Sequence, residues 1–209
     1  MIDIVARHLD AIDGAFFDFG GVVVHAPTAS GWCVLDYCEC NGIDRAFALA
    51  EIARMRRATD GGEMSLEECY RIIAEGAGAK VEPGFAKMAT ELDCATWTNL
   101  ADETFALMKE LKAAGKKVGI LSNMSRDFFS AQYCRVAAHI RAICDAEIIS
   151  GIIRITKPDP RIFALASEKI GIAPERLLFL DDIQGNVEAA RRCGWRAERY
   201  SLDADAALR

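Results

Sequence analysis

Apolar and polar positions divide the chain into short apolar runs and longer stretches with helical periodicity. Apolar runs that end at glycine or polar residues are typical of buried strands, and apolar positions three to four residues apart are typical of helices. The expected strands cover residues 15–17, 117–121, 147–149, 177–180 and about 196–200, and helices are expected over 2–11, 101–113, about 126–138, about 157–171 and 186–193. Strands that alternate with helices predict an α/β fold, in which a parallel sheet carries helices on both faces.

One stretch interrupts this alternation directly after the first strand. Residues 32 to about 93 have a helical pattern throughout and contain no clear strand. Within this stretch, Ser65 and Glu68 form a capping box ahead of a helix over 66–74. The position of the interruption predicts an inserted helical cap rather than a separate domain. We therefore expect an α/β core formed by residues 1–25 and 94–209 and a small all-α cap formed by residues 26–93.

The composition favours a folded protein that does not bind nucleic acid. Hydrophobic residues make up 52% of the 209-residue chain and charged residues 27%, which is enough apolar material for a packed core. The formal net charge of −6 disfavours duplex nucleic acid as a partner, because phosphate contacts need a basic surface. A small anionic substrate is compatible with this charge, because a local positive field can oppose the overall one.

The cysteines do not indicate a zinc site, and the apolar segments do not indicate a membrane span. The eight cysteines at positions 33, 38, 40, 69, 94, 134, 144 and 193 form no C-x-x-C pair, so we interpret them as buried, reduced side chains of a cytosolic protein. The first residues, MIDIVARHLDAID, lack the apolar segment of a signal peptide, and no apolar run approaches the ~20 residues of a membrane span. We therefore expect a cytoplasmic protein with no membrane contact.

Polar side chains follow the ends of several expected strands. They are Asp18, the pair Ser122-Asn123, Lys157 in a following loop, and the pair Asp181-Asp182. In open parallel sheets, ligands bind outside the carboxyl ends of the strands, so these side chains are expected to share one site. Each alone has a simpler interpretation as a turn residue, a helix cap or a solvated lysine. Their occurrence in order at successive strand ends favours the shared site.

These residue types together suit the hydrolysis of a phosphate ester. Asp18 and Asp182 can share a hard cation through oxygen ligands. That cation and Lys157 would offset the repulsion between an attacking carboxylate and an anionic phosphate. Ser122 and nearby backbone amides can hold phosphate oxygens, and an Asp18 nucleophile would form an aspartyl-phosphate that water then hydrolyses.

Four segments of the chain resemble, in order, the four motifs of the haloacid dehalogenase-like hydrolases. They are FFDFGGVVV, ILSNMSRD, KPDPRIF and LLFLDDIQGNVEAARRCGW, and they span nearly the whole chain from Asp18 to Gly194. The last two are the most specific, and they are similar to those of the phosphatase domain of soluble epoxide hydrolases and of bacterial sugar-phosphate phosphatases. The resemblance implies a Rossmann-like sheet of order 5-4-1-2-3 and a cap that closes over the site and selects the substrate.

The resemblance also implies a role for each residue. Asp18 would be the nucleophile and Lys157 the charge stabiliser of a Mg²⁺-dependent phosphohydrolase that acts on a small phosphorylated metabolite. The residues expected to bind the phosphate are Gly20, Gly21, Ser122 and Asn123. The residues expected to bind Mg²⁺ are Asp18, Asp182, Gly20 through its backbone carbonyl, and Asp181 as a water-mediated partner.

Gly20 departs from the family pattern. Most phosphatases of the family carry a second aspartate two residues after the nucleophile, which protonates the leaving group and later activates water. Because general acid–base catalysis is worth about 10²–10⁴-fold, kcat/KM is expected to fall from aryl to anomeric to alkyl phosphates, and Gly20→Asp is expected to raise the alkyl rate. A flat dependence would indicate another proton donor, for which the candidates are His25, Asp60 and Glu63. Each of these is more simply interpreted as a solvated loop residue.

Two other functions are compatible with the sequence. The 2-haloacid dehalogenases of the same superfamily use an aspartate nucleophile without Mg²⁺ and without the second aspartate, as Gly20 would allow, but they have less need for the Asp181-Asp182 pair. A degenerate fold that only binds phosphorylated ligands or protein partners is compatible with the loss of the acid, and the retention of Asp18, Lys157 and Asp182 opposes it. Mg²⁺-dependent phosphate release from an aryl phosphate would separate a phosphatase from both.

Overall fold

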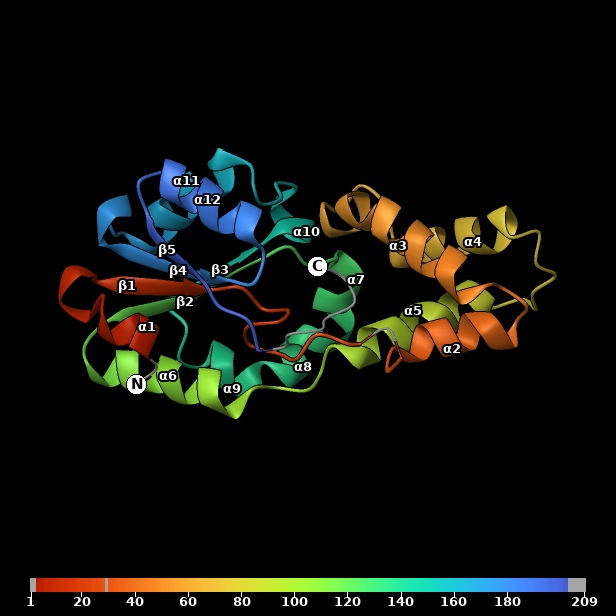
Figure 1. Ribbon diagram of the computed structural model, residues 1–209, viewed down its shortest axis with the longest axis horizontal. Coiled ribbons are helices and arrows are strands. Elements are labelled where there is room, and N and C mark those ends of the chain that lie inside the picture. Colours follow the sequence, from red (N-terminus) through yellow and green to blue (C-terminus); the bar gives the residue numbers. More distant parts are fainter. Residues whose placement is uncertain (1–2, 29, 203–209) are drawn as a thin grey trace.

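The computed structural model describes residues 3–28 and 30–202, and in that part of the chain it contains a five-stranded sheet (Figure 1). The strands are β1 (Gly14–Phe17), β2 (Lys117–Ser122), β3 (Ala146–Ile149), β4 (Leu177–Asp181) and β5 (Arg196–Arg199). All neighbouring strands pair in parallel, in the order β3-β2-β1-β4-β5. This confirms the parallel sheet and the predicted order 5-4-1-2-3, which is the same order taken from the other edge.

The central strands are apolar because both of their faces are buried. Every residue of β1 and of β4 is buried. Along β1, Ala15 and Phe17 belong to the hydrophobic core on one face of the sheet, whereas Phe16 belongs to the core on the other. A strand that packs on both sides needs a continuous apolar run instead of an alternating pattern, and such runs are what identify these strands in the sequence.

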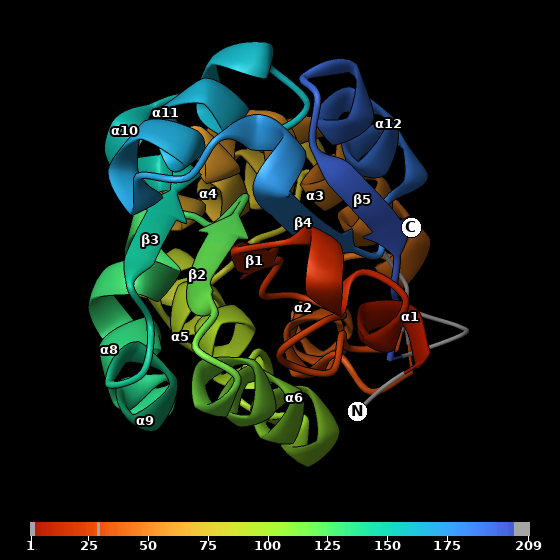
Figure 2. The ribbon, with the colours of Figure 1, turned by 90° about the vertical axis from the view of Figure 1, so that its left-hand side faces the viewer.

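Helices cover both faces of the sheet (Figure 2). On one face lie α11 (Pro160–Ile170) and α12 (Gln184–Arg192), and on the other lie α1 (Asp3–Ala6), α6 (Asp102–Ala113) and α9 (Ala138–Arg141). Helix α11 starts at an Asp159 cap, whose side chain accepts a hydrogen bond from the Arg161 amide at 2.9 Å. It ends at Gly171, which has a left-handed φ of 70°. None of the described helices is long and apolar enough to cross a membrane.

The helix expected over 126–138 is divided into short segments. They are α7 (Arg126–Phe128), a π-helical turn (Phe129–Tyr133), α8 (Cys134–Val136) and the start of α9. The wide turn contains Tyr133, which is fully buried and donates its hydroxyl hydrogen bond to Oε1 of Glu147 on β3 at 2.6 Å. Helical periodicity does not indicate this turn, because the turn depends on a partner strand. The helix expected over 2–11 is likewise shorter, consisting of α1 and a 3₁₀ turn (Leu9–Ala11), with residue 2 outside the described part.

Four helices lie together at one end of the molecule, beyond the carboxyl ends of the strands (Figure 1). These cap helices are α2 (Cys33–Cys40), α3 (Arg45–Asp60), α4 (Leu66–Gly76) and α5 (Phe85–Thr96). The segments that join them to the sheet run side by side, since the His25 amide donates to the Asn99 carbonyl and the Ala101 amide to the Val23 carbonyl, each at 2.9 Å. Helix α5 continues to Thr96, so the boundary predicted at residue 93 falls inside a helix. The division into core and cap stays a prediction.

Three of the cysteines are exposed, which differs from the expectation that all of them are buried. All eight are free, and the exposed ones are Cys33, Cys40 and Cys134. Cys33 and Cys40 are the first and last residues of α2, whose buried positions are Val34, Leu35 and Cys38. Because residues seven apart lie on the same side of a helix, Cys33 and Cys40 share the face opposite these buried positions, and a count of cysteines in the sequence does not distinguish the two locations.

Candidate active site

Neighbouring strands bring polar side chains to the same edge of the sheet. Asp18 directly follows β1, Ser122 ends β2 and Asp181 ends β4. The strand register pairs Phe17, the last residue of β1, with Ile120 of β2 and with Leu180 of β4. Asp18 and Asp181 therefore lie at the same level of the sheet, with Ser122 one residue further along, and all three are buried. This is the edge at which open parallel sheets bind ligands.

The Lys157 side chain is buried between two of these carboxylates. Its Nζ lies 3.0 Å from Oδ1 of Asp18 and 2.6 Å from Oδ2 of Asp181, and it donates to the Leu121 carbonyl at 3.0 Å. Burial opposes a charged amine, but the carboxylates of Asp18 and Asp181 outweigh burial and raise the pKa of Lys157 above its ordinary value. The lysine is therefore charged beside Asp18, and the interpretation of Lys157 as a solvated surface residue is wrong.

Asp181 is held in place by several donors. Its Oδ1 accepts from the Ile183 amide at 2.8 Å, and the Asn186 side chain donates to both carboxylate oxygens at 3.1 Å. These bonds, with the Lys157 contact, orient the carboxylate so that it positions the ammonium. Asn186 belongs to the fourth motif, but the sequence alone does not indicate its role, because its contact with Asp181 depends on the geometry of the first turn of α12.

Asn123 holds the backbone of the segment that carries Lys157. Its Oδ1 accepts from the Lys157 amide at 2.8 Å, and its Nδ2 donates to the Lys157 carbonyl at 3.0 Å. This two-way pairing ties the end of β2 to the Lys157 segment. The phosphate-binding roles expected of Ser122 and Asn123 stay predictions. The side-chain amide of Asn123 also holds the Lys157 backbone in place.

Three buried carboxylates lie close enough to share one cation. Asp18, Asp181 and Asp182 each offer an oxygen, and these oxygens lie within 4.8 Å of one another. Burial raises the pKa of Asp18 to about 7, with Lys157 lowering it and the two neighbouring carboxylates adding to the rise. One ammonium cannot neutralise three carboxylates, so this set of donors fits a hard divalent cation such as Mg²⁺, which prefers oxygen ligands.

Gly21 lets the backbone approach Asp182. Its φ is 74°, in the left-handed region, and a Cβ at this position would lie 2.8 Å from Oδ2 of Asp182. A side chain at residue 21 would therefore both strain the turn and displace the carboxylate. The second glycine of the FGG sequence is required by the geometry of the candidate metal site.

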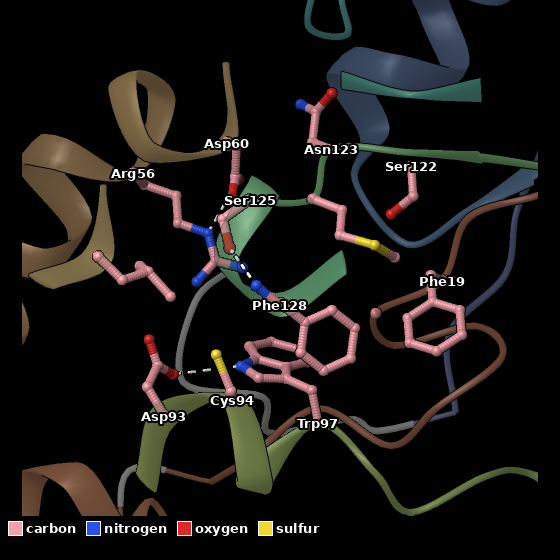
Figure 3. A pocket seen from close by; sticks show the side chains of 13 residues that line it. Phe19, Arg56, Asp60, Asp93, Cys94, Trp97, Ser122, Asn123, Ser125 and Phe128 are labelled. Carbon is pink, nitrogen blue, oxygen red and sulfur yellow. Dashed lines mark hydrogen bonds and ion pairs between the residues drawn. The ribbon is translucent and has the colours of Figure 1, made fainter. Parts of the chain in front are cut away.

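A cleft of about 880 Å³ opens between this edge of the sheet and the cap helices. From the sheet side it is lined by Asp18, Lys157 and Asp182, and from helix α3 by Arg56 and Asp60. A smaller pocket of about 50 Å³ lies next to it, with Arg56 and Asp60 on the cap side and Ser122 and Asn123 on the sheet side (Figure 3). The described residues that line these two cavities do not include His25 or Glu63.

Trp97 fills the space beside Gly20. A Cβ on Gly20 would lie 3.0 Å from Cζ3 of the indole, which lines both cavities. The Arg56 guanidinium packs on the same ring, with its Cζ 5.2 Å from the centroid. The position at which the family carries its second aspartate is thus crowded by a tryptophan from the segment that returns to the sheet. No pattern in the sequence indicates this contact, because the two residues are far apart in the chain.

The chain is similar over most of its length to one protein family. The family described as haloacid dehalogenase-like hydrolase matches residues 12–194. A phosphatase of Mycobacterium tuberculosis (strain CDC 1551 / Oshkosh) is 36% identical over 96 residues, which cover 46% of this chain and 43% of that protein. The (S)-2-haloacid dehalogenase 4A of Burkholderia cepacia is 28% identical over 94 residues, which cover 45% of this chain and 40% of that protein. The matches span less than half the length of these two curated relatives.

A solved structure has the same fold. It is a HAD family enzyme from Bacteroides thetaiotaomicron in complex with magnesium and inorganic phosphate, with a TM-score of 0.74 and 18% sequence identity. The superposition covers 92% of this chain and 96% of that one. At this level of identity the likeness concerns the fold alone.

Proposed function

The chain belongs to the haloacid dehalogenase-like hydrolase family, and we propose that it is a Mg²⁺-dependent phosphohydrolase that cleaves the phosphate ester of a small metabolite. The observation that carries this proposal is the ammonium of Lys157, which is buried between Asp18 and Asp181 with the Asp182 carboxylate beside them. Attack by a carboxylate on an anionic phosphate needs compensating positive charge, and this arrangement provides it at the attacking atom.

In the proposed reaction, Asp18 is the nucleophile. Its Oδ1 accepts from the Phe19 amide at 2.7 Å and from Lys157, which fixes the orientation of the carboxylate. An oxygen of Asp18 bonds to phosphorus, and the bond from phosphorus to the ester oxygen breaks. Water then attacks the phosphorus of the aspartyl-phosphate, which releases phosphate and restores Asp18. Lys157 stabilises the phosphoryl oxygens, with Ser122 as a further donor.

The residues proposed to hold the metal are Asp18, Asp182 and the Gly20 backbone carbonyl, with Asp181 acting through water. Bound there, Mg²⁺ would supply positive charge to the phosphoryl oxygens. The hydrogen bonds of Asp181 to Lys157, Ile183 and Asn186 support an orienting role for this carboxylate. The close approach of the Gly21 backbone to the Asp182 carboxylate supports a role for Asp182 as a metal ligand.

We propose that residues 26–93 act as a cap that limits the size of the substrate. The cleft of about 880 Å³ is within the range of small-molecule sites, and its cap side is formed by α3. Its apolar lining includes Leu49 and Ala53, and its charged lining includes Arg56 and Arg57. A phosphorylated metabolite of moderate size, with its phosphate at Lys157 and its remainder under α3, fits this cleft.

The test is a screen of phosphorylated metabolites with and without Mg²⁺, using Asp18→Asn as the blank. We expect Mg²⁺-dependent phosphate release from the wild type and none from Asp18→Asn, because an amide is not a nucleophile of this kind. Thermal unfolding of both proteins checks that the isosteric change leaves the fold intact. Wild-type turnover by Asp18→Asn would contradict the mechanism.

A dehalogenase of the same superfamily is the second candidate. Gly20 and the similarity to the Burkholderia cepacia enzyme favour it. The close set of three buried carboxylates opposes it, since a reaction without a metal has no need of them. Chloride release from 2-chloropropionate in the presence of EDTA would support a dehalogenase, whereas phosphate release that stops on addition of EDTA would support the phosphohydrolase.

A further inference from the structure

The proposed reaction lacks an evident proton donor for the leaving oxygen. Residue 20 has no side chain, and the ring of Trp97 comes within 3.0 Å of the place that a Cβ would take. The described residues that line both cavities beside Gly20 include one carboxylate from the cap helices, Asp60. Asp60 is the last residue of α3 and is 7% exposed. Figure 3 shows it above the pocket, near Arg56 and across from Ser122.

Asp60 is fixed against the sheet by a direct hydrogen bond. The Ser150 hydroxyl donates to the Asp60 carbonyl at 2.6 Å and accepts from the Met124 amide at 2.8 Å. Met124 follows the Ser122-Asn123 pair at the end of β2. The cap residue and the predicted phosphate-binding segment are therefore linked through one buried side chain.

The turn after Asp60 also packs closely on the sheet side. Gly62 has a φ of 69°, and a Cβ there would lie 2.6 Å from the Gly151 carbonyl oxygen. Asp127 of α7 accepts a hydrogen bond from the Leu66 amide at the start of α4, at 2.9 Å. These contacts hold the Asp60 carboxyl at a defined place beside the cleft instead of in a solvated loop.

Burial favours a proton on Asp60, and the groups around it act in both directions. Arg56 Nε donates to Oδ2 of Asp60 at 3.0 Å, and the same pocket contains a second buried carboxyl group, that of Asp93. Asp93 accepts from Nε1 of Trp32 at 3.0 Å and from Nε1 of Trp97 at 3.4 Å. Burial raises the pKa of Asp93 above its ordinary value, although the Arg56 guanidinium and the indole donors lower it.

Burial favours a proton on both carboxyl groups, and Asp60 is the one of the two that lines both cavities. Burial raises the pKa of Asp60, the Arg56 guanidinium and the Lys157 ammonium lower it, and the Asp93 charge adds to the rise. The net direction is upward, so Asp60 retains a proton at higher pH than an ordinary aspartate does.

From this geometry we infer that Asp60 is the general acid and base of the reaction, in place of the aspartate that residue 20 lacks. The inference rests on the proposed phosphohydrolase function. As the bond from phosphorus to the ester oxygen breaks, that oxygen takes the Asp60 proton, which leaves a carboxylate. The carboxylate then takes a proton from the water that attacks the aspartyl-phosphate, and Asp60 returns to its starting state with phosphate and Asp18 released.

The test compares Asp60→Asn with Glu63→Gln on two classes of ester. Nitrophenyl phosphates leave as stable phenolates and need no proton, whereas simple alkyl phosphates leave as basic alkoxides and need one. We expect Asp60→Asn to lower kcat/KM for alkyl phosphates by about 10²–10⁴-fold and to leave kcat/KM for nitrophenyl phosphates unchanged. Glu63 is exposed and lies in the same turn, so Glu63→Gln is the matched control and should change neither value.

A second readout follows the base step. Asp60→Asn should lower kcat for nitrophenyl phosphates and allow phosphorylated Asp18 to accumulate, because leaving-group departure is intact and hydrolysis of the intermediate is slowed. The amount of phosphorylated Asp18 is measured by trapping the phosphoenzyme with a rapid acid quench. An equal loss of kcat/KM on both ester classes, or no loss on alkyl esters, would overturn the inference.

The outcomes separate this inference from the function on which it rests. If the wild type hydrolyses both classes with Mg²⁺ and Asp60→Asn matches it on alkyl esters, Asp60 is not the acid and the phosphohydrolase stands. If the wild type hydrolyses neither class, both proposals are overturned.

Should Asp60→Asn fail to fold, Asp93→Asn provides the test through the pH profile. Removal of the Asp93 charge should shift the alkaline limb of kcat/KM for alkyl esters to lower pH, because the proton on Asp60 is then held less firmly. An unshifted limb would count against Asp60.

Discussion

At the scale of single residues, the choice of amino acid at position 20 is limited by a neighbouring side chain and not by the backbone conformation. The φ of Gly20 is not among the positive values that glycine alone adopts readily, in contrast to Gly21 at 74°. The restriction is the indole of Trp97, which is 3.0 Å from the place of a Cβ. A contact this tight requires the ring to shift by a few tenths of an ångström before any side chain fits.

This crowding limits what an aspartate at residue 20 can do. In an Asp60→Asn background, we expect Gly20→Asp to restore little activity on alkyl phosphates, because Trp97 occupies the space that the new carboxyl needs. Gly20→Asp combined with Trp97→Leu should restore more, and Trp97→Leu without an acid serves as the control. The measurement is kcat/KM on an alkyl ester, and full restoration by Gly20→Asp alone would contradict the steric argument.

Asn186 offers a second test at this scale. Its amide donates to both oxygens of Asp181, which in turn contacts Lys157 at 2.6 Å. Asn186→Ala should lower kcat by about 10–100-fold, as is typical for residues that orient the groups around a metal site, with a smaller effect on KM. Gln184→Ala, at an exposed position on the same helix, should have no effect. Equal kinetics for the two variants would show that Asp181 needs no orientation by Asn186.

At the scale of elements, one short helix forms hydrogen bonds to both the sheet side and the cap helices. Helix α10 (Ser150–Ile153) follows β3, and its first residue bonds both to the end of β2 and to the end of α3. Ser150 is fully buried, so its hydroxyl is not replaced by water when it is removed. The element therefore fixes the distance between the predicted phosphate-binding segment and Asp60.

Ser150→Ala should lower the free energy of unfolding by about 1–3 kcal/mol, because it leaves the buried Asp60 carbonyl and Met124 amide without this partner. Ser167→Ala is the matched control, since the Ser167 hydroxyl oxygen is buried and has no hydrogen-bond partner among the described residues. That control should be neutral or slightly stabilising. Urea denaturation measures both, and a neutral Ser150→Ala would mean that the α10 contact contributes nothing to stability.

At the scale of the whole molecule, the candidate metal site lies where the edge of the sheet meets the cap helices. The carboxylates of Asp18, Asp181 and Asp182 are buried together under the cap helices, and their mutual repulsion disfavours the folded state in the absence of a cation. A cation that binds only the folded protein therefore stabilises the molecule as a whole.

Mg²⁺ alone should raise the Tm, without any substrate present. At a concentration 100-fold above Kd the gain is about 2.7 kcal/mol, which corresponds to roughly 5–11 °C for a domain of about this size. Asp182→Asn should abolish the rise and Asp60→Asn should keep it, because only the former is a proposed ligand. Differential scanning calorimetry with and without EDTA measures the shift, and an equal rise in Asp182→Asn would place the metal elsewhere.

Local patterns in the sequence are enough to predict the sheet and the candidate chemistry at its edge. Apolar runs such as that of β4 identify buried strands, because a strand covered on both faces must be apolar throughout. Asp18, Ser122, Lys157 and Asp181 follow from the rule that the carboxyl ends of parallel strands converge on one edge. Both properties are encoded within a few consecutive residues, and the family motifs cover the same positions.

The way in which the cap helices meet that edge follows from contacts between distant segments of the chain. The crowding of Gly20 by Trp97, the bond from Ser150 to Asp60 and the pairing of Asn186 with Asp181 depend on how separate elements pack. The π-helical turn that contains Tyr133 likewise depends on a partner strand. No local pattern encodes such contacts, because their free energy arises only when segments distant in the chain are already folded and in place.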